Sequence, residues 1–145
     1  MPRIGSTLIT LVAITTSLGC YLADWNETHI HNPRWPPHAK FHNGQTMSMG
    51  MVLGLTTLYY LHRRAPSAEM KSRDLSTAVW TGSLYWITQL SALFYPGSLA
   101  TDPEFGTGAP QVYICAAMFA MLGVGLWMER RCLESELGAS MLKKD

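Results

Sequence analysis

The chain has 145 residues, of which 48% are hydrophobic and 14% charged, and its formal net charge at pH 7 is +1. This length suits one domain, and the small net charge without a basic patch argues against nucleic acid as a partner. The charged residues gather in a few short segments between long uncharged runs, which is typical of a small polytopic membrane protein rather than of a soluble globule.

The first uncharged run covers residues 4–23. At ~1.5 Å per residue its length reaches about 30 Å, the thickness of the hydrocarbon core of a bilayer. A cleaved signal peptide is the alternative, but the run is long for one and no A-x-A-like cleavage site follows it. We therefore predict a membrane-spanning helix over residues 4–23.

Residues 24–43 follow, and this first loop holds four of the five histidines together with Asp24, Glu27 and two tryptophans. Connecting loops are usually rich in Gly, Ser and Asn. The many titratable and aromatic side chains here therefore make this loop the first candidate for a functional site. The cysteines offer no second candidate, because the three of them show neither C-x-x-C spacing nor an even number for a disulfide framework.

The end of this loop has the pattern of a helix start, because Pro37 suits a first helical turn. His38 and His42 would then lie four residues apart on one face, which continues with Gln45. We expect both rings to point into the bundle rather than into water. The uncharged run that follows predicts a second span over residues 44–61.

Two further uncharged runs predict spans over residues 75–95 and 110–128. In the first of them polar side chains recur at helical spacing, and this polar face either lines a cavity or forms hydrogen bonds between helices. Its residues are Thr81, Tyr85, Thr88 and Gln89. In the last run, Gly123 and Gly125 would allow a neighbouring helix to approach closely.

Basic residues are frequent in the linker 62–74 and in the C-terminal tail, whereas the first loop has only Arg34 and Lys40 and the third loop, residues 96–109, has none. The positive-inside rule therefore predicts that both termini are cytosolic and that the first and third loops share the opposite face. We predict an all-α membrane protein, a four-transmembrane-helix bundle with a His/Asp/Glu-rich first loop. It would form one domain over residues 1–145 in the endoplasmic reticulum membrane.

Acid–base chemistry is the first interpretation of the face that the two loops share. Desolvation at the rim of an apolar cavity raises the pKa of a carboxyl group, which can then protonate a substrate oxygen while a second carboxylate or a histidine accepts a proton. Asp24 ends the first span and Asp102 lies in the third loop, so a four-helix bundle could bring them together. Glu27 and Glu104 are the reserve pair, and a helix cap is the competing role of each acid.

Two other interpretations remain open. His38 and His42 could share a metal ion with His29 or His31, but a lone H-x-x-x-H pattern carries little information, and we expect neither a metal nor a cofactor. Alternatively, the first loop belongs to a non-catalytic scaffold, and its Trp and His side chains lie in the interfacial belt of the membrane.

The first loop contains Asp-Trp-Asn-Glu-Thr-His and, further on, Trp-Pro-Pro-His-Ala-Lys-Phe-His-Asn. With four predicted spans, this motif resembles a family of small integral-membrane proteins encoded with microbial, largely fungal, secondary-metabolite pathways. The resemblance covers essentially the whole chain and points to the membrane epoxide hydrolases of polyene α-pyrone polyketide pathways, of the aurovertin and citreoviridin kind. It implies regioselective opening of a polyene epoxide by water or an internal hydroxyl group.

By their place in this motif, the resemblance nominates Asp24, Glu27, His29, His38, His42 and Asn43. Of these, Asn43 is a candidate for substrate binding, as are Trp35, Gln45, Tyr85 and Gln89. The expected partners are a lipophilic small molecule and the lipid bilayer, and self-association is left open. The alternative reaction is double-bond isomerisation, as in the emopamil-binding sterol isomerases. It would need a neutral carboxylic acid and an aromatic side chain that stabilises a cation, for which Trp80, Tyr85 and Trp86 are available.

Overall fold

The computed structural model describes the backbone of residues 3–141 and the side chains of residues 3–137. Over these residues the protein consists of helices and contains no strand. The helices are α1 (Ile4–Asp24), α2 (Pro37–His62), α3 (Ala68–Ser91), the short 3-10 helix η1 (Ala92–Phe94) and α4 (Pro110–Met141). The predicted all-helical fold class is therefore confirmed.

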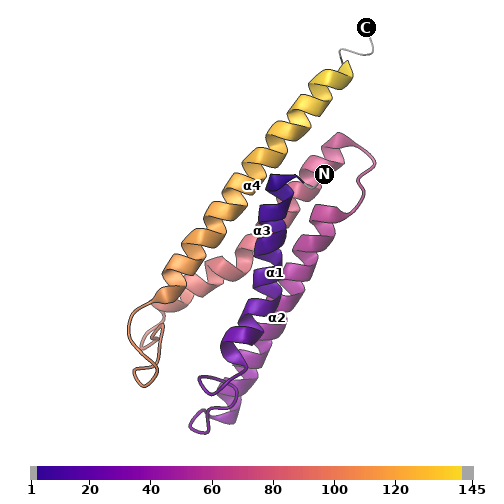
Figure 1. The fold of residues 1–145 in the computed structure, drawn as a ribbon. Helices are drawn as coiled ribbons and strands as arrows, with labels where there is room; N and C mark the ends of the chain where they lie inside the picture. The colour runs from indigo at the N-terminus through magenta and orange to yellow at the C-terminus, as the bar shows by residue number, and fades with distance from the viewer. Residues whose placement is uncertain (1–2, 142–145) are drawn as a thin grey trace.

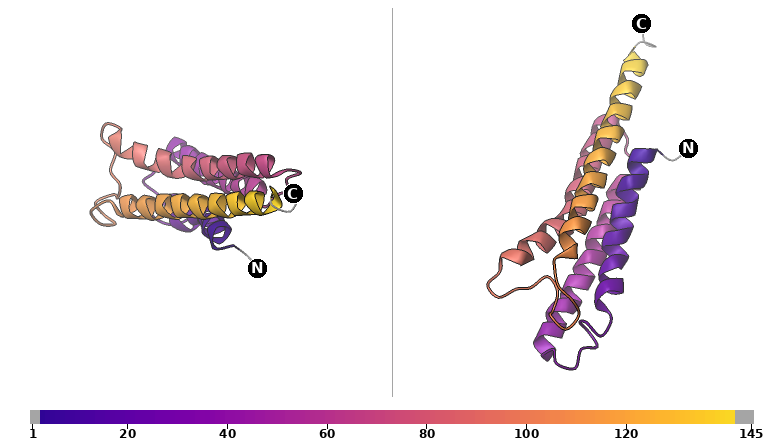
Figure 2. Two further views of the ribbon diagram at one scale, coloured as in Figure 1. Left: turned by 90° about the horizontal axis from the view of Figure 1, so that it is seen from above. Right: turned by 60° about the vertical axis from the view of Figure 1, so that its left-hand side comes forward.

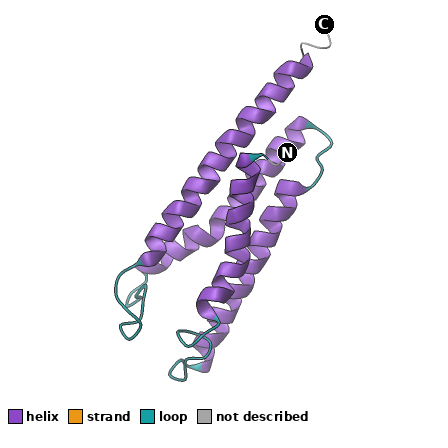
Figure 3. Ribbon diagram, in the orientation of Figure 1, coloured by secondary structure: helices purple, strands orange, loops and turns teal. Residues whose placement is uncertain are grey.

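The four α-helices form a bundle in which each one packs against two neighbours (Figure 1, Figure 3). α1 and α3 both lie beside α2 and α4, so they face each other across the bundle. In the structure the first loop is shorter than predicted and covers residues 25–36, because α2 already begins at Pro37. It lies with the third loop (residues 95–109) at one end, which we call the loop end. The N-terminus and the linker 63–67 lie at the other, the terminal end. At the loop end α3 diverges from α1 and α2, as the right-hand view of Figure 2 shows.

The helices extend beyond the uncharged runs, because a charged side chain does not by itself end a helix. α2 begins at Pro37, as the helix-start pattern predicted. α3 begins at Ala68, where the Ser67 side chain caps the first turn by accepting a hydrogen bond from the backbone N–H of Met70. It ends at Ser91, before the short η1. α4 continues past the predicted end at residue 128 through a charged segment of good helix formers.

Two of the helices, α1 and α4, are long and apolar enough to cross a membrane. Their length and composition indicate association with a membrane. α2 and α3 do not reach the same hydropathy, because their uncharged parts contain many Ser, Thr, Tyr and Gln side chains. By this measure, two of the four predicted spans are found.

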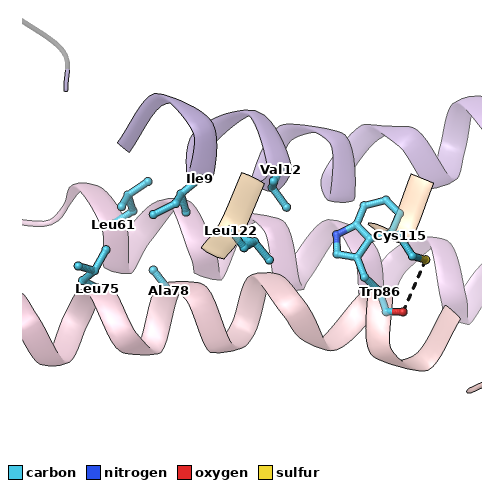
Figure 4. Close-up of a cluster of buried hydrophobic side chains, with 8 residues drawn as sticks. All are labelled: Ile9, Val12, Leu61, Leu75, Ala78, Trp86, Cys115 and Leu122. Carbon is cyan, nitrogen blue, oxygen red and sulfur yellow. Dashed lines mark hydrogen bonds between the residues drawn. The ribbon is translucent and has the colours of Figure 1, made fainter. Parts of the chain in front are cut away.

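All four helices contribute to one buried apolar cluster (Figure 4). Its members are Ile9, Val12, Leu61, Leu75, Ala78, Trp86, Cys115 and Leu122. The indole N–H of Trp86 donates a hydrogen bond to Thr16 Oγ1 of α1 at 3.1 Å, and the Cys115 thiol of α4 donates one to the Trp86 carbonyl oxygen at 3.7 Å. Trp86 therefore joins α3 to both α1 and α4.

α1 and α2 cross very closely at Gly54. A Cβ atom built on Gly54 would lie 2.0 Å from Ser17 Oγ and 2.4 Å from the carbonyl oxygen of Ala13. A side chain at position 54 would therefore have to push the backbone of α1 away. This crossing sets how α2 is rotated against α1.

A second close approach joins α1 to α4 at the terminal end. A Cβ atom on Gly125 would lie 2.9 Å from the carbonyl oxygen of Gly5, so the predicted packing role of Gly125 is confirmed. Gly123 is exposed, and nothing lies within 4 Å of its Cβ position. The same prediction for Gly123 was wrong, because this residue faces away from the other helices.

We predict that Gly54→Ala destabilises the folded protein by about 1–3 kcal/mol, the usual cost of overpacking. The matched control is Gly123→Ala, which should be neutral or stabilising by up to about 1 kcal/mol, because alanine favours the helix and has room there. Thermal unfolding of both variants in the same detergent measures the difference. Equal midpoints for the two variants would mean that the crossing accommodates a methyl group.

At the terminal end, Asp74 of α3 is buried, with 3% of its surface exposed, and pairs with Arg63. Arg63 Nε donates a hydrogen bond to Asp74 Oδ2 at 2.7 Å, and Arg63 Nη2 donates one to Oδ1. The guanidinium also lies over the Tyr60 ring, 4.8 Å from its centroid. The hydrogen bonds from Arg63 hold the pKa of Asp74 below its usual range.

This ion pair makes stability depend on pH. Because the pKa of Asp74 is lower in the folded protein, the pair stabilises the fold above the unfolded pKa of about 3.9 and loses this effect as the pH falls through the folded pKa. We predict that Asp74→Asn lowers the thermal midpoint by several degrees at neutral pH and that the difference from the parent shrinks in acid. Glu69→Gln breaks an exposed pair with Arg73 and should change little, because exposed pairs contribute little. A pH-independent difference for Asp74→Asn would contradict this account.

Candidate active site

A cavity of about 460 Å³ opens at the loop end, where α3 diverges from α1. This volume is within the range of small-molecule sites in proteins. All four α-helices, η1 and the first and third loops contribute to its wall, which is mainly apolar. Asp24 and His29 supply a carboxylate and an imidazole to this wall, so two of the predicted catalytic residues meet in one cavity.

Asp24 is the last residue of α1, and an asparagine from α2 fixes its carboxylate. Asn43 Nδ2 donates a hydrogen bond to Asp24 Oδ2 at 2.7 Å. The other carboxylate oxygen, Oδ1, lies 3.8 Å from His29 Nδ1. The sequence had suggested that Asn43 binds substrate. Asn43 is buried and does not line the cavity, so its role is to orient Asp24.

The local turn after α1 determines which nitrogen of His29 carries the proton. The backbone N–H of Thr28 and the Thr28 hydroxyl both donate to Asn26 Oδ1, at 2.8 and 2.6 Å. Thr28 Oγ1 also lies 2.6 Å from His29 Nδ1. The hydroxyl has one proton, and it is already committed to Asn26, so His29 Nδ1–H must be the donor in this contact. Nε2 of the neutral imidazole is therefore left with a lone pair, which suits it to accept a proton.

The polar face of α3 serves two purposes. Tyr85 and Gln89, four residues apart, line the same cavity as Asp24. Thr81 Oγ1 instead lies 3.1 Å from Thr57 Oγ1 of α2, in a hydrogen bond between helices. Part of this face therefore lines the cavity, and another part forms a hydrogen bond between helices.

Gln111 of α4 also lines the cavity, and the sequence had not singled it out. Its Nε2 donates a hydrogen bond to the Ala100 carbonyl oxygen at 2.6 Å, while its buried Oε1 has no hydrogen-bond partner among the described residues. The signal was a glutamine in the first turn of an apolar run, directly after Pro110. Gln111 thus connects α4 to the third loop beside the cavity.

The two acids of the third loop lie elsewhere. Asp102 and Glu104 line a second, more open hollow at the loop end, together with Asn32 and Arg34 of the first loop. We call it the outer hollow. Glu104 forms an ion pair with Arg34 and accepts a hydrogen bond from Asn32 Nδ2 at 3.4 Å. Asp24 and Asp102 line different hollows, so the expected pairing of these two acids is wrong. The third loop places Asp102 at the outer hollow instead of at the cavity.

Trp35 lines the outer hollow and not the cavity. Its ring packs edge-on against the ring of His29 with 4.8 Å between the centroids. The sequence had suggested Trp35 for substrate binding. In the structure its ring supports the imidazole of His29.

His38, His42 and Gln45 of α2 are exposed and do not line the cavity. The expectation that the two rings point into the bundle is wrong, because Asn43 and the close crossing at Gly54 turn the other face of α2 towards α1. The Nε2 atoms of His38 and His42 are 3.0 Å apart. Gln45 Oε1 lies 3.4 Å from His42 Nδ1. Glu27 is exposed as well.

Within the part of the chain that the structure describes, no three His, Cys, Asp or Glu side chains come together in a way that could hold a metal ion. His38 and His42 offer two ligands, whereas zinc sites use three or four protein ligands. His29 is turned to Asp24, and the ring of His31 packs edge-on against Trp25 with 6.2 Å between the centroids.

Comparison with known proteins found no curated protein and no solved structure that matches this chain. A match was found to one protein family, which is described as a family of unknown function (DUF6640) and covers residues 8–138. The matched range includes the first loop, the cavity and most of each of the four α-helices. The chain therefore belongs to this family of unknown function, DUF6640.

Proposed function

We propose that the cavity is the active site of a membrane-embedded enzyme that opens an epoxide of a lipophilic molecule, such as a polyene polyketide intermediate, by acid–base catalysis. The observation that carries this proposal is the Asp24–His29 pair on the wall of a mainly apolar cavity. The choice of epoxide opening rests on the resemblance of the first loop to membrane epoxide hydrolases. The opening of an epoxide by water needs a proton acceptor for the nucleophile and a donor to the ring oxygen, and an apolar pocket suits a lipophilic substrate.

In the proposed mechanism, water or a hydroxyl group of the substrate attacks one epoxide carbon, and the bond from that carbon to the ring oxygen breaks. His29 Nε2 takes the proton of the nucleophile, and the carboxylate of Asp24 stabilises the resulting imidazolium. Tyr85 and Gln89 donate hydrogen bonds to the ring oxygen as it gains negative charge. The imidazolium then returns its proton to this oxygen, so no cofactor is needed.

We further propose that α2 and α3 cross the membrane with α1 and α4. The cost of a hydroxyl in lipid is the loss of its hydrogen bonds to water, and here these bonds are replaced within each helix. Every Ser and Thr hydroxyl of α2, and every one of α3 from Ser76 onward, donates to a backbone carbonyl in the preceding turn. Composition alone therefore makes these helices look more polar than they are.

The outward faces of the helices support the same proposal. On α2 the exposed side chains at helical spacing are apolar or aromatic: Met49, Val52, Leu55 and Tyr59. On α1 the corresponding residues are Leu11, Ile14, Leu18 and Leu22. Soluble monomers rarely expose apolar patches of this extent, whereas a lipid-facing surface requires them.

We propose that both termini are cytosolic and that the loop end faces the lumen of the endoplasmic reticulum. The basic residues at the terminal end support this orientation. Glycosylation acceptor sites introduced into the first and third loops should be modified in microsomes. Modification of acceptors in the linker 63–67 instead would reverse the orientation.

The reaction is tested by incubating the purified protein in lipid nanodiscs with lipophilic polyene epoxides in isotopically labelled water. Uptake of one labelled oxygen, or formation of a cyclic ether, is the expected result. Deuterium at carbon without a gain of oxygen would favour the alternative, a double-bond isomerase, for which Trp86 and Tyr85 in the cavity wall could stabilise a cation. Turnover of neither kind would leave the scaffold interpretation.

A further inference from the structure

Part of the third loop forms one wall of the cavity without being packed into the bundle. Ser98, Leu99 and Ala100 line the cavity. Along residues 98–105 the apolar side chains remain open, since Leu99 is 67% exposed and Phe105 is 43% exposed. A segment that buries so little apolar surface can move at small cost.

This segment lies between two glycines with unusual backbone angles. Gly97 has a φ of 77° and Gly106 has a φ of 147°, values that only glycine adopts readily. These two positions can change their backbone angles without a steric penalty from a side chain. Residues 98–105 are therefore a unit with a hinge at each end.

The segment is held at the cavity by the hydrogen bond from Gln111 Nε2 of α4 to the Ala100 carbonyl oxygen and by contacts that cross to the first loop. Glu104 forms an ion pair with Arg34 and accepts a hydrogen bond from Asn32; we call these three residues the latch. Asn32 is 2% exposed, and its Oδ1 accepts a hydrogen bond from the backbone N–H of Arg34 at 2.9 Å. Asn32 and the backbone of Arg34 are therefore held in position by a contact within the first loop, which does not depend on Glu104.

We propose that residues 98–105 are a lid at the mouth of the cavity and that the latch holds this lid in place. When the latch opens, the mouth of the cavity at the loop end widens, and water and polar products exchange there more readily. The Arg34 side chain of the latch is 68% exposed and that of Glu104 is 31% exposed. A pair this exposed shifts an equilibrium by no more than about fivefold, which suits a lid that opens repeatedly.

The proposal of a lid depends on the proposed function only in that the cavity admits a ligand. The movement of the lid can be tested without measuring turnover. The full chain carries Cys132→Ser, to remove its most accessible thiol, and Thr15→Cys as a reporter on the cavity wall. The protein is placed in lipid nanodiscs and treated with a positively charged methanethiosulfonate, which does not dissolve in the lipid. Mass spectrometry then gives the modification rate at each cysteine, with the chain lacking Thr15→Cys as the baseline.

We expect Glu104→Gln and Arg34→Gln each to raise the modification rate at position 15 by about threefold to fivefold. The charge swap of Arg34→Glu with Glu104→Arg should return the rate towards that of the parent. Glu69→Gln, which breaks an exposed pair of α3 far from the latch, is the matched control and should leave the rate unchanged.

Unchanged rates in both latch variants would overturn the lid. So would an equal rise in the Glu69→Gln control, or a rise at Cys115, which is fully buried and reports general loosening of the bundle. Absence of epoxide turnover with an intact latch effect would reject the proposed reaction and keep the lid. The two proposals can therefore fail separately.

Discussion

Asp24→Asn is expected to reduce turnover by about 10²- to 10⁴-fold, the usual contribution of acid–base assistance. The substitution keeps the size of the side chain, and its amide oxygen can still accept the hydrogen bond that Asn43 Nδ2 now donates to the carboxylate. What is lost is the negative charge beside His29 Nδ1. Without this charge the imidazolium that forms during the reaction is no longer stabilised.

The control for this experiment is Asp102→Asn. The sequence treated Asp24 and Asp102 as partners, but Asp102 is exposed and lines the outer hollow. It should therefore keep a rate close to that of the parent. Steady-state kinetics of both variants, with thermal midpoints to check folding, decide the matter. Equal losses would mean that the third loop brings Asp102 into the cavity during the reaction.

Much of the fold follows from patterns along the chain. The four uncharged runs lie within or largely coincide with the four α-helices, and Pro37 correctly marks the start of α2. Such features depend on local sequence, because helix formation and its first turn involve residues close in the chain. The start of α3 and the end of α4 were predicted less well, since charge was used as a boundary although it does not end a helix.

The site was predicted in part. Asp24 and His29 line the cavity together with Tyr85 and Gln89, for which the sequence had left open whether their helix face lines a cavity or bonds to another helix. The rotation of α2 could not be read from its sequence, because it depends on the crossing at Gly54, a contact with α1. His38 and His42 therefore face outward.

Long-range contacts also explain the roles that the sequence missed. The sequence suggested Asn43 for substrate binding and missed its role in orienting Asp24, since the hydrogen bond between them joins residues on two different helices. The ion pair between Glu104 and Arg34 connects two loops that are far apart in the chain. The residue types were informative, but their partners were set by tertiary packing.

The second large effect is expected at His29. If His29 accepts the proton of the nucleophile, His29→Gln should lower turnover by about 10²- to 10⁴-fold, because an amide does not titrate. If His29 only orients Asp24, glutamine should preserve most of the rate, since its N–H can still donate a hydrogen bond. Steady-state kinetics of the variant separate the two roles, with its thermal midpoint to check that it folds.

His42→Gln and His38→Gln are the matched controls, because these side chains carry the same chemistry on the exposed face of α2. The sequence had nominated both as site residues, whereas the structure leads us to expect almost no loss from either substitution. His62→Gln, at the terminal end, should also be tolerated, since its ring contacts only Thr10 Oγ1, at 2.9 Å, among the hydrogen bonds of the described residues. A tolerant His29 with a large loss at His38 or His42 would move the reaction out of the cavity, because no rotation of a single side chain brings those two rings from the outer face of α2 to Asp24.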